Sequence, residues 1–430
     1  MSLLKQFFTK FVLGMAHGAG FLSVFGILGV AIVFFQPELR AKVSNRIFPS
    51  NQVSSNTELS SYVVKDKVPN PKASLISGRN QITVPADYRR VSVDSEQALY
   101  ETLESTNGNV AIFLADGVYD LHSTIVLDKP NVMLLSQAGN KETVIFNGKG
   151  MRRSHRVENL IEITSSGAVI DGITMQNAGN HIIQIRSEAN ADFPVIRNCT
   201  IRDGYEQLIK VSYDKRNKPY NYSDSGIIEN CLFEYTAGIG PNYYIGGIDA
   251  HGVRNWVIKN NVFKHIASPG NRIAEHAIHL WNNTENNVVE GNVIIDSDRG
   301  IGFGMWKKAS GDENKNIRFS NYGGIIRNNF IYHSDNGNPF ADTGIILENS
   351  PRTLVENNVI YMEHPYRRAI EYRFPQTEEV TIKNNFTNKS ISSRNGGKAE
   401  LENNVEALQK TEFLLKAHQF SLENNLDFTF

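Results

Sequence analysis

The sequence is poor in cysteine and has no excess of charge of either sign. Two of its 430 residues are cysteines, which limits the chain to one disulfide, and the pair does not resemble a metal site. Forty-four basic residues balance 45 acidic ones, so no net field draws the chain to nucleic acid or repels anions. Long apolar runs are also scarce, and the N-terminal segment is the exception.

Residues 11–35 contain no Asp, Glu, Lys or Arg and are long enough to cross a bilayer. A cleaved signal peptide is the competing interpretation. The run is longer than a typical signal core, however, and no small-x-small cleavage site follows it. We therefore expect residues 1–35 to form an uncleaved transmembrane anchor. Lys5 and Lys10 favour a cytoplasmic N-terminus, which predicts a single-pass protein of the bacterial inner membrane with its C-terminal domain in the periplasm.

The rest of the chain divides into a polar tether at 36–90, a repeat domain at 91–405 and a C-terminal cap at 406–430. Asp94 or Ser95 can cap a short helix at 96–104, which we expect to close the N-terminal end of the repeats. Helical spacing at 406–418 predicts a second helix over the other end.

A phrase of apolar residues around asparagine recurs along the repeat domain. Examples are V-I-R-N-C-T-I from Val195, V-I-K-N-N-V-F from Val257 and L-V-E-N-N-V-I from Leu354. The first Asn of each phrase recurs at eight positions, at one of which Gly takes its place. These are Asn198, Asn230, Asn260, Gly291, Asn328, Asn357, Asn384 and Asn403. Repetition at such a period indicates stacked supersecondary units.

The phrases hold short runs of Val, Ile and Phe without a 3.6-residue period, so we expect strands and turns. A right-handed parallel β-helix satisfies this pattern, because each coil contributes strands that pair with those of the next. Asn tolerates the left-handed conformation of such turns, and one Asn per coil can stack into an amide ladder. The prediction is an all-β solenoid with an N-terminal transmembrane helix and short capping helices.

The two cysteines, Cys199 and Cys231, occupy the same place in consecutive phrases. They should therefore lie on neighbouring coils, within reach of a disulfide. Two stacked interior thiols are an equally good interpretation.

A second phrase lies between the Asn phrases and carries polar residues at alternate positions. Because side chains alternate across a strand, Ile248 and Ala250 should point inward, as should Ile278 and Leu280. The residues between and after them should form two outward columns. One column reads Gln184, Lys210, Asp249, His279, Gly302, Ile346 and Glu371, and the other reads Arg186, Ser212, His251, Trp281, Gly304, Glu348 and Arg373.

The middle coils carry more histidine, acidic and aromatic residues on this face than an ordinary solvent-exposed sheet does. We expect a cleft with a hollow at Gly302 and Gly304, walled by long loops on both sides. The candidate catalytic residues are Asp249, His251, His276, His279 and Arg299. The candidate substrate-binding residues are Lys210, Tyr244, Trp281, Glu348, Glu371 and Arg373.

A metal is not assigned to this face. Asp249, His251, His276 and His279 could in principle hold a divalent ion, but their spacing is not diagnostic. Calcium at the turn that contains Asp296 and Asp298 is a comparable possibility, beside a simple Asx turn. We therefore predict no cofactor, with calcium as the alternative.

The residue types suit removal of a proton from the carbon next to a carboxylate. Histidine can take the proton near neutral pH, and Arg299 or Arg373 offers a fork that fits a planar carboxylate. Trp281 and Tyr244 could stack on sugar faces. The alternative is a glycoside hydrolase in which Glu348 and Glu371, on adjacent coils, act as paired carboxylates.

The chain resembles the pectate-lyase-like superfamily of right-handed parallel β-helix proteins over roughly residues 85–410, beginning with F-L-A-D-G-V-Y-D-L from Phe113. G-I-D-A-H-G from Gly247, with H-A-I-H-L from His276, is similar to the catalytic region of mannuronan C5-epimerases and alginate lyases. Asp249 and His251 match the first Asp and the His of their Asp-Pro-His-Asp motif, whereas Ala250 and Gly252 depart from it.

The resemblance implies that Asp249 assists, that His251 or His276 is the base, and that Arg299 neutralises a uronate carboxylate. We expect a membrane-anchored, carbohydrate-active enzyme that acts on an acidic polysaccharide by C5 proton abstraction, as a lyase or a C5-epimerase. The expected partners are this polysaccharide and, through residues 11–35, the membrane. The other alternative is a non-catalytic glycan-binding protein of the cell envelope.

Overall fold

The computed structural model describes residues 76–77, 81–153, 157–214, 221–270, 272–305, 319–334, 337 and 340–424. The predicted anchor at 1–35 and the tether up to residue 75 lie outside the described residues. Within the described part, no helix has the length and apolar character that a membrane span requires. All described residues belong to one compact unit, Asn70–Phe430.

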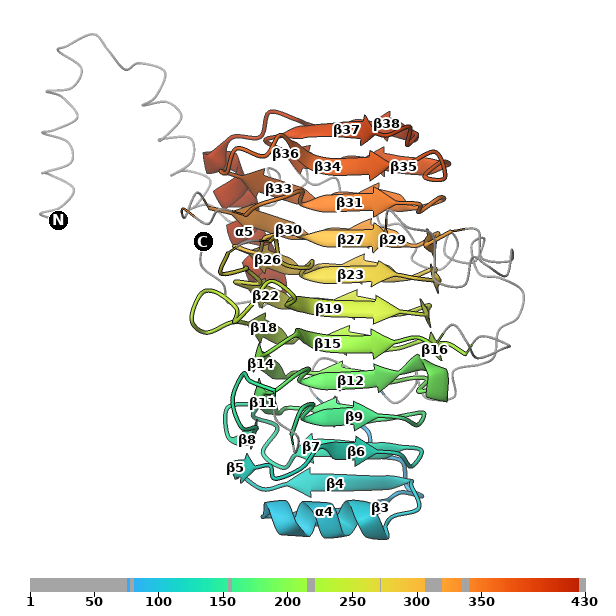
Figure 1. Cartoon of the computed structure of the whole chain (residues 1–430), viewed down its shortest axis with the longest axis vertical. Coiled ribbons are helices and arrows are strands. Elements are labelled where there is room, and N and C mark those ends of the chain that lie inside the picture. Colours follow the sequence, from blue (N-terminus) through green and yellow to red (C-terminus); the bar gives the residue numbers. More distant parts are fainter. Residues whose placement is uncertain are drawn as a thin grey trace, which may run out of the picture. The chain divides into compact units, whose positions relative to one another are not determined.

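Three parallel sheets run along this unit, and each coil of the chain adds one strand to each of them in turn (Figure 1). Among the described residues, the first sheet has the order β3 (Arg89–Val93), β4 (Val110–Leu114), β7 (Val132–Ser136), β10 (Val169–Asp171), β13 (Val195–Arg197), β17 (Ile227–Glu229), β21 (Val257–Lys259), β25 (Val288–Glu290), β29 (Ile325–Arg327), β32 (Leu354–Glu356), β35 (Val380–Lys383) and β38 (Ala399–Glu402).

The second sheet follows the first in ten coils, while β3 and β38 have no counterpart in it among the described residues. Its order is β36 (Phe386–Thr387), β33 (Val359–Met362), β30 (Phe330–His333), β26 (Val293–Ile295), β22 (Val262–Lys264), β18 (Leu232–Glu234), β14 (Thr200–Gly204), β11 (Thr174–Ala178), β8 (Val144–Asn147) and β5 (Gly117–Asp120).

The third sheet completes the coil. Its order is β37 (Ser390–Arg394), β34 (Arg368–Arg373), β31 (Ile345–Glu348), β27 (Ile301–Gly304), β23 (Ile278–Trp281), β19 (Gly246–His251), β15 (Gln207–Ser212), β12 (Ile183–Arg186), β9 (Ile161–Ile163) and β6 (Ile125–Leu127).

Short elements supplement these sheets. A four-stranded sheet consists of β16 (Ser223–Asp224), β20 (Val253–Arg254), β24 (Thr284–Glu285) and β28 (Asn321–Tyr322). A separate two-stranded sheet pairs β1 (Ile76–Ser77) with β2 (Gln81–Ile82), and η3 (Ser187–Ala189) is a short 3-10 helix. The predicted parallel β-helix is therefore confirmed. Parallel crossovers are right-handed in nearly all proteins, and that sense is the one we expect here.

The asparagine phrases form the corner between the first and second sheets. Each of their first residues, from Asn198 to Asn403, has a φ between 51° and 65°, as predicted for a left-handed turn. The amide ladder stands one residue later than expected, at Asn261, Asn292, Asn329, Asn358, Asn385 and Asn404. The side-chain N–H₂ of each of the first five donates to the Oδ1 of the next at 2.9–3.0 Å, inside the solenoid.

Cys199 and Cys231 occupy the ladder position in the two preceding coils. Both are buried as free thiols, so the stacked-thiol interpretation holds and the disulfide does not. Their Sγ atoms face the carbonyls of Ile170 and Ile196, where later coils place an asparagine amide.

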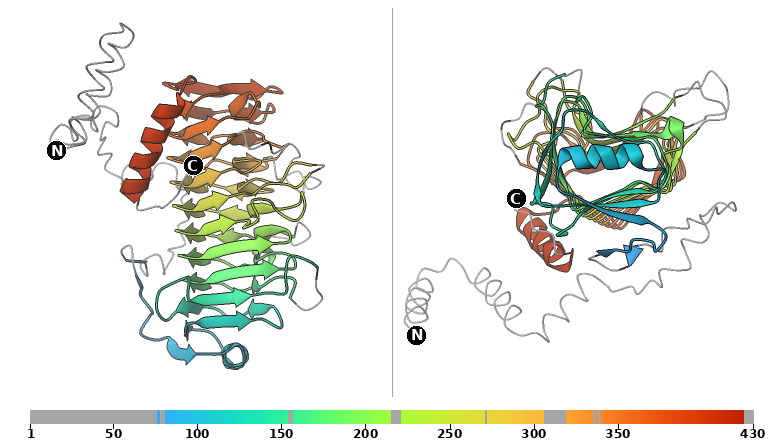
Figure 2. Two further views of the ribbon diagram at one scale, coloured as in Figure 1. Left: turned by 90° about the vertical axis from the view of Figure 1, so that its left-hand side faces the viewer. Right: turned by 90° about the horizontal axis from the view of Figure 1, so that it is seen from below.

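Helix α4 (Glu96–Ser105) lies across the N-terminal end of the solenoid, as predicted (Figure 2). Ser95 is its N-cap, with its Oγ accepting from the N–H of Ala98, and Leu99 is fully buried. The folded unit begins earlier than the expected end of the tether at residue 90, because Tyr88 is buried and β3 starts at Arg89.

Helix α5 (Lys410–Asn424) does not cover the C-terminal end, where we expected it. It lies along the outer face of the second sheet (Figure 2). Phe413 and Ala417 pack there against a cluster that contains Val293, Phe330 and Tyr332. The described residues leave the last coil open, with Leu401 45% and Val405 38% exposed.

Candidate active site

The two predicted columns lie on the outer face of the third sheet, in the expected register. Strand pairing aligns Gln184, Lys210, Asp249, His279, Gly302, Ile346 and Glu371 in one row. His251 pairs with Trp281, and Gly304 pairs with Glu348 and then Arg373, in the other. The apolar residues between them, such as Ile248 and Leu280, are fully buried inside the coil.

Most of these outward side chains are nevertheless covered, which corrects the expectation that they face solvent. Asp249 is 4% exposed, His279 2% and Glu371 0%, because neighbouring polar side chains and flanking segments pack over them. The expected hollow at Gly302 is filled: a Cβ there would lie 2.9 Å from His276 Nε2 and 3.0 Å from His279 Cδ2. Gly304 is packed against the backbone oxygen of Glu348.

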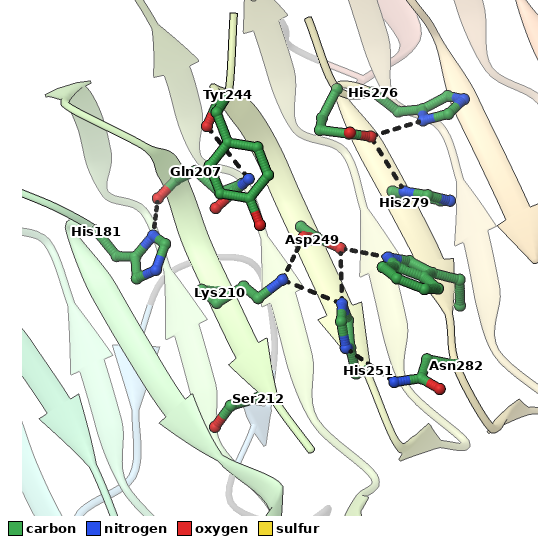
Figure 3. Close-up of polar contacts among 12 residues, drawn as sticks. His181, Gln207, Lys210, Ser212, Tyr244, Asp249, His251, His276, His279 and Asn282 are labelled. Atoms are coloured by element: carbon green, nitrogen blue, oxygen red, sulfur yellow. Dashed lines mark hydrogen bonds and ion pairs between the residues drawn. The ribbon is translucent and has the colours of Figure 1, made fainter. Parts of the chain in front are cut away.

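The first group on this face, here the His251 cluster, joins Lys210, Asp249, His251, Trp281 and Asn282 (Figure 3). The Lys210 ammonium donates to Asp249 Oδ2 and lies 3.0 Å from His251 Nε2. Trp281 Nε1 donates to Asp249 Oδ1 at 2.7 Å, and Asn282 Nδ2 lies 3.2 Å from His251 Nδ1. Strands β15, β19 and β23 thus bring an acid, an amine and an imidazole into contact.

The charges of the His251 cluster are fixed by this packing. Burial alone would raise the pKa of Asp249, but Lys210 and the neighbouring imidazoles outweigh it and hold that pKa well below its usual range. Burial and then the Lys210 charge lower the pKa of His251. At neutral pH the cluster therefore contains a carboxylate and a neutral imidazole.

Tyr244 borders this cluster from the loop that precedes β19. Its side chain is 44% exposed, and Figure 3 shows its ring directed toward Lys210 and Asp249. Burial raises the pKa of its phenol above the usual range, so the hydroxyl keeps its proton at neutral pH. A depression of about 520 Å³ lies next to it, lined by Asn242, Tyr243, Pro269, Gly270 and Arg272.

The second group, here the His279 cluster, contains Glu275, His276, His279, Arg299 and Asp342. His279 Nε2 lies 2.9 Å from the carbonyl oxygen of Gly304. Arg299 lies 3.9 Å from Glu275 Oε2 and 3.5 Å from Asp342 Oδ2, so neither carboxylate holds it at hydrogen-bond distance. The two clusters adjoin, since the His279 and Trp281 rings stack with centroids 5.5 Å apart.

The third group, here the Glu371 cluster, is an ion-pair network further along the sheet. Arg373 pairs with Glu348, and Glu371 receives Arg394 at 2.7 Å and Tyr366 Oη at 3.0 Å. Glu371 is buried without any exposed surface. The predicted binding residues Glu348, Glu371 and Arg373 are thus brought together, but as ion pairs with protein groups, and Glu371 Oε1 and Arg373 Nε have no hydrogen-bond partner among the described residues.

The turn proposed for calcium is occupied by hydrogen bonds from the protein. Asp298 Oδ2 accepts from the backbone N–H groups of Ser268 and Ala274, and Asp296 Oδ1 accepts from the N–H and hydroxyl of Ser334. These carboxylates tie the turn to distant loops, which differs from an Asx turn, where the side chain bonds to its own backbone two residues on.

Five residues of these clusters were not predicted, namely Asn282, Glu275, Asp342, Tyr366 and Arg394. Asn282 follows β23 directly, and the sequence pattern assigned it no role. Glu275 precedes His276, so a regular strand would place the two on opposite faces. Residues 273–276 are not in a strand, which lets both side chains reach His279. The sequence E-H-A-I-H could have indicated this group. Its side chains meet only because the backbone before β23 is irregular, which the sequence does not reveal.

Comparison with known proteins finds no matching family model and no matching curated protein. Similar solved structures include an alginate lyase from Paenibacillus sp. str. FPU-7, at 15% identity and a TM-score of 0.46, covering 73% of this chain and 98% of that one.

Two further structures illustrate the range of similar proteins. A mannuronic acid specific polysaccharide family 6 lyase from human gut microbiota has 13% identity and a TM-score of 0.47, covering 74% of this chain and 82% of that one. A tailspike protein of an E. coli bacteriophage, in complex with a pentasaccharide, has 13% identity and a TM-score of 0.49, covering 69% and 53%. Every one of these TM-scores is below 0.5, so we assign the fold from the chain's own sheets and not from these similarities. The three parallel sheets make the chain a parallel β-helix protein.

Proposed function

We propose that this chain acts on an acidic, uronate-containing polysaccharide by removing the proton at C5 of a uronate unit. The observation that carries the proposal is the His251 cluster, in which a neutral imidazole lies against a Lys–Asp pair on the outer face of the third sheet. Membrane anchoring through residues 11–35 and a periplasmic location belong to the same proposal.

His251 is the proposed base. Its lowered pKa keeps Nε2 available for a proton at neutral pH. In the resting site Lys210 donates toward this nitrogen, and it also donates to Asp249. Because Asp249 holds the ammonium, Nε2 can exchange its contact with Lys210 for the substrate C–H without releasing a free charge.

The proton on the carbon next to a carboxylate becomes acidic enough for a histidine to remove it only if the charge of that carboxylate is neutralised. Arg299 is the candidate, because its guanidinium is partly exposed and its two described carboxylate neighbours, Glu275 and Asp342, lie 3.9 Å and 3.5 Å away without a hydrogen bond. Tyr244, protonated at neutral pH and close to Lys210 and Asp249, is the candidate acid.

Two reactions share this first step. In β-elimination, the C5–H electrons form the C4=C5 double bond, the C4–O bond breaks, and Tyr244 gives its proton to the leaving oxygen. In epimerisation, the C4–O bond stays and a proton returns to C5 from the opposite face. The His251 cluster serves either reaction, and the position of the acid relative to the substrate decides between them.

The hydrolytic alternative is less well supported. It requires Glu348 and Glu371 to reach a glycosidic bond, whereas Glu371 is fully buried, forms an ion pair with Arg394 and accepts a hydrogen bond from Tyr366. A binding protein without catalysis remains the alternative from another class, because polar columns can hold sugars without reacting with them.

The test is incubation of the purified full-length chain with polymers of mannuronate, guluronate and galacturonate. Ultraviolet absorbance of the new double bond reports elimination, and uptake of solvent deuterium without chain cleavage reports epimerisation. New reducing ends without absorbance would instead support hydrolysis. Binding with none of these signals would support the glycan-binding alternative.

A matched pair of variants tests the base. His251→Gln should lower the rate about 10²–10⁴-fold, the usual contribution of a general base, because the amide cannot take the proton. His122→Gln, at an exposed imidazole near helix α4, should leave the rate unchanged. Full activity of His251→Gln would remove this residue from the mechanism.

A further inference from the structure

Three buried polar atoms of the His279 cluster converge without a hydrogen-bond partner. They are Glu275 Oε2, His276 Nδ1 and His279 Nδ1. Glu275 Oε2 lies 3.6 Å from His279 Nδ1 and 3.9 Å from His276 Nδ1. Across the described residues, this is the one group of three or more His, Cys, Asp or Glu side chains whose potential ligand atoms lie within 4.8 Å of one another.

The hydrogen bond on the far side of His279 defines its tautomer. His279 Nε2 lies 2.9 Å from the carbonyl oxygen of Gly304, and a carbonyl can only accept, so Nε2 carries the hydrogen. In the neutral ring the lone pair is then on Nδ1, which faces Glu275. Histidines that bind metals commonly donate their other N–H to a backbone carbonyl in this way.

The Nδ1 lone pair of His279 and the carboxylate oxygen of Glu275 are both electron-rich and repel each other unless a positive charge lies between them. One candidate is a second proton on His279, and the other is a metal ion. A proton would serve Glu275 and His279 but would leave His276 Nδ1 without a partner. A metal ion would engage all three atoms, and leaving buried polar groups unpaired is costly.

We propose that Glu275, His276 and His279 bind a divalent transition-metal ion of the Zn²⁺ class. Two imidazoles and one carboxylate are a donor set that zinc accepts, whereas Mg²⁺ and Ca²⁺ favour oxygen alone. Tetrahedral bonds of about 2.0–2.2 Å place ligand atoms roughly 3.4 Å apart. The observed 3.6 Å and 3.9 Å are therefore a small contraction away from a coordination shell.

The surroundings also prepare these side chains as ligands. Gly302 makes room for both rings, since any Cβ would press on them.

Arg299 and Asp342 are the other charged groups of this cluster. Arg299 Nη1 lies 3.9 Å from Glu275 Oε2, which is too far for a hydrogen bond, so it competes with the ion by charge and not by contact. With three protein ligands, a fourth coordination position would stay open. An ion there would add positive charge beside Arg299 for a uronate carboxylate, a consequence that rests on the proposed function. Metal binding itself does not.

The test measures metal content, not activity. The full-length chain is purified with chelator, dialysed against Zn²⁺ and analysed for bound metal, and Co²⁺ is added separately as a visible-absorbance probe of ligand geometry. We expect one Zn²⁺ per chain, the strong absorbance of four-coordinate Co²⁺, and a higher unfolding temperature with Zn²⁺ than with chelator. Absence of both bound Zn²⁺ and this absorbance would overturn the proposal.

Variants locate the ion. Glu275→Gln, which keeps the shape, and His279→Gln should each weaken Zn²⁺ binding at least tenfold. His251→Gln is the matched control on the same sheet face and should keep one Zn²⁺. Wild-type affinity in both Glu275→Gln and His279→Gln, or loss of the ion in His251→Gln, would place the ion elsewhere and overturn the assignment.

Discussion

At the scale of single residues, Lys210 controls the proton affinity of His251. Its ammonium lies 3.0 Å from His251 Nε2, and its charge is the second cause, after burial, of the lowered pKa of His251. Asp249 acts in the opposite direction and raises that pKa. Removing Lys210 therefore leaves an imidazole that binds its proton more tightly.

This relation predicts the pH dependence of the proposed reaction. In the wild type, kcat/KM should rise with pH along an acidic limb whose midpoint lies below 6.5, the ordinary pKa of histidine. In Lys210→Met the limb should move to higher pH, whatever happens to the maximal rate. Lys259→Met, at a lysine of the first sheet that pairs with Glu229, should leave the limb in place. A limb that stays or moves to lower pH in Lys210→Met would contradict this role.

The sequence was sufficient to align the residues of this face but not to predict their contacts. Alternation along a strand is enforced by its geometry, so the rows that contain Lys210, Asp249 and His279 could be predicted. Burial could not, because it depends on which polar side chains of neighbouring coils pair with one another, as Lys210 and Trp281 do with Asp249. Glu275 also escaped prediction, since its direction depends on an irregular backbone before β23.

At the scale of elements, the asparagine ladder joins the coils along one corner. Each interior amide donates to the next coil and to a backbone carbonyl, as Asn261 does to Asn292 and to Ile228. The two cysteines interrupt this ladder at its N-terminal end. Cys231 still donates its backbone N–H to Asn261 Oδ1, so the geometry of the ladder continues through it.

The ladder can therefore be extended by one residue. In Cys231→Asn, the new amide should donate to Asn261 Oδ1 and to the carbonyl of Ile196, and its own oxygen should face the N–H of Cys199. We expect a gain of about 1 kcal/mol, the net contribution of a typical buried hydrogen bond, measured by urea unfolding.

The reverse change provides the comparison. Asn329→Ala should destabilise the chain by roughly 3 kcal/mol or more, because Asn292 and the carbonyl of Val289 lose their partner in the interior. A destabilised Cys231→Asn would show that this corner is packed for sulfur and not for the amide.

The position of helix α5 shows what helical spacing cannot predict. The spacing of Leu408, Phe413 and Leu414 predicts a helix but not the surface that receives it, and the structure buries Phe413 while leaving Leu414 41% exposed. The receiving surface was present in the sequence as outward apolar residues of the second sheet, Val293 and Phe330 among them. In a sheet whose outer face is exposed to solvent these positions would be polar. Their apolar side chains therefore indicate that another element packs over this face.

At the scale of the whole molecule, the solenoid carries buried neutral histidines at several levels. Burial lowers the pKa of His181 to about 4 and that of His364 to about 3, and those of His251 and His276 are lowered as well. A folded-state pKa below the unfolded value of 6.5 stabilises the fold above pH 6.5. That contribution is lost as the pH falls toward the folded-state pKa.

His181 tests this effect at the edge of the proposed active site, where its Nδ1 lies 2.9 Å from the Gln207 carbonyl oxygen. Between pH 6.5 and 4 its titration should cost the wild type roughly 3 kcal/mol, from a shift between 6.5 and about 4. His181→Gln should start less stable, since a hydrogen bond to the Gln207 carbonyl changes, but should lose correspondingly less over the same interval. Equal losses in urea unfolding at both pH values would contradict the neutral, buried state of His181.

The open last coil has a consequence for association. Strand β38 ends the first sheet within the described residues, and a second copy could in principle continue the pairing there. Its exposed side chains include Glu400 and Glu402. Growth into a fibre would have to join this edge to the N-terminal end of the next copy, which helix α4 covers. That cover keeps a structure built by repetition from extending without end.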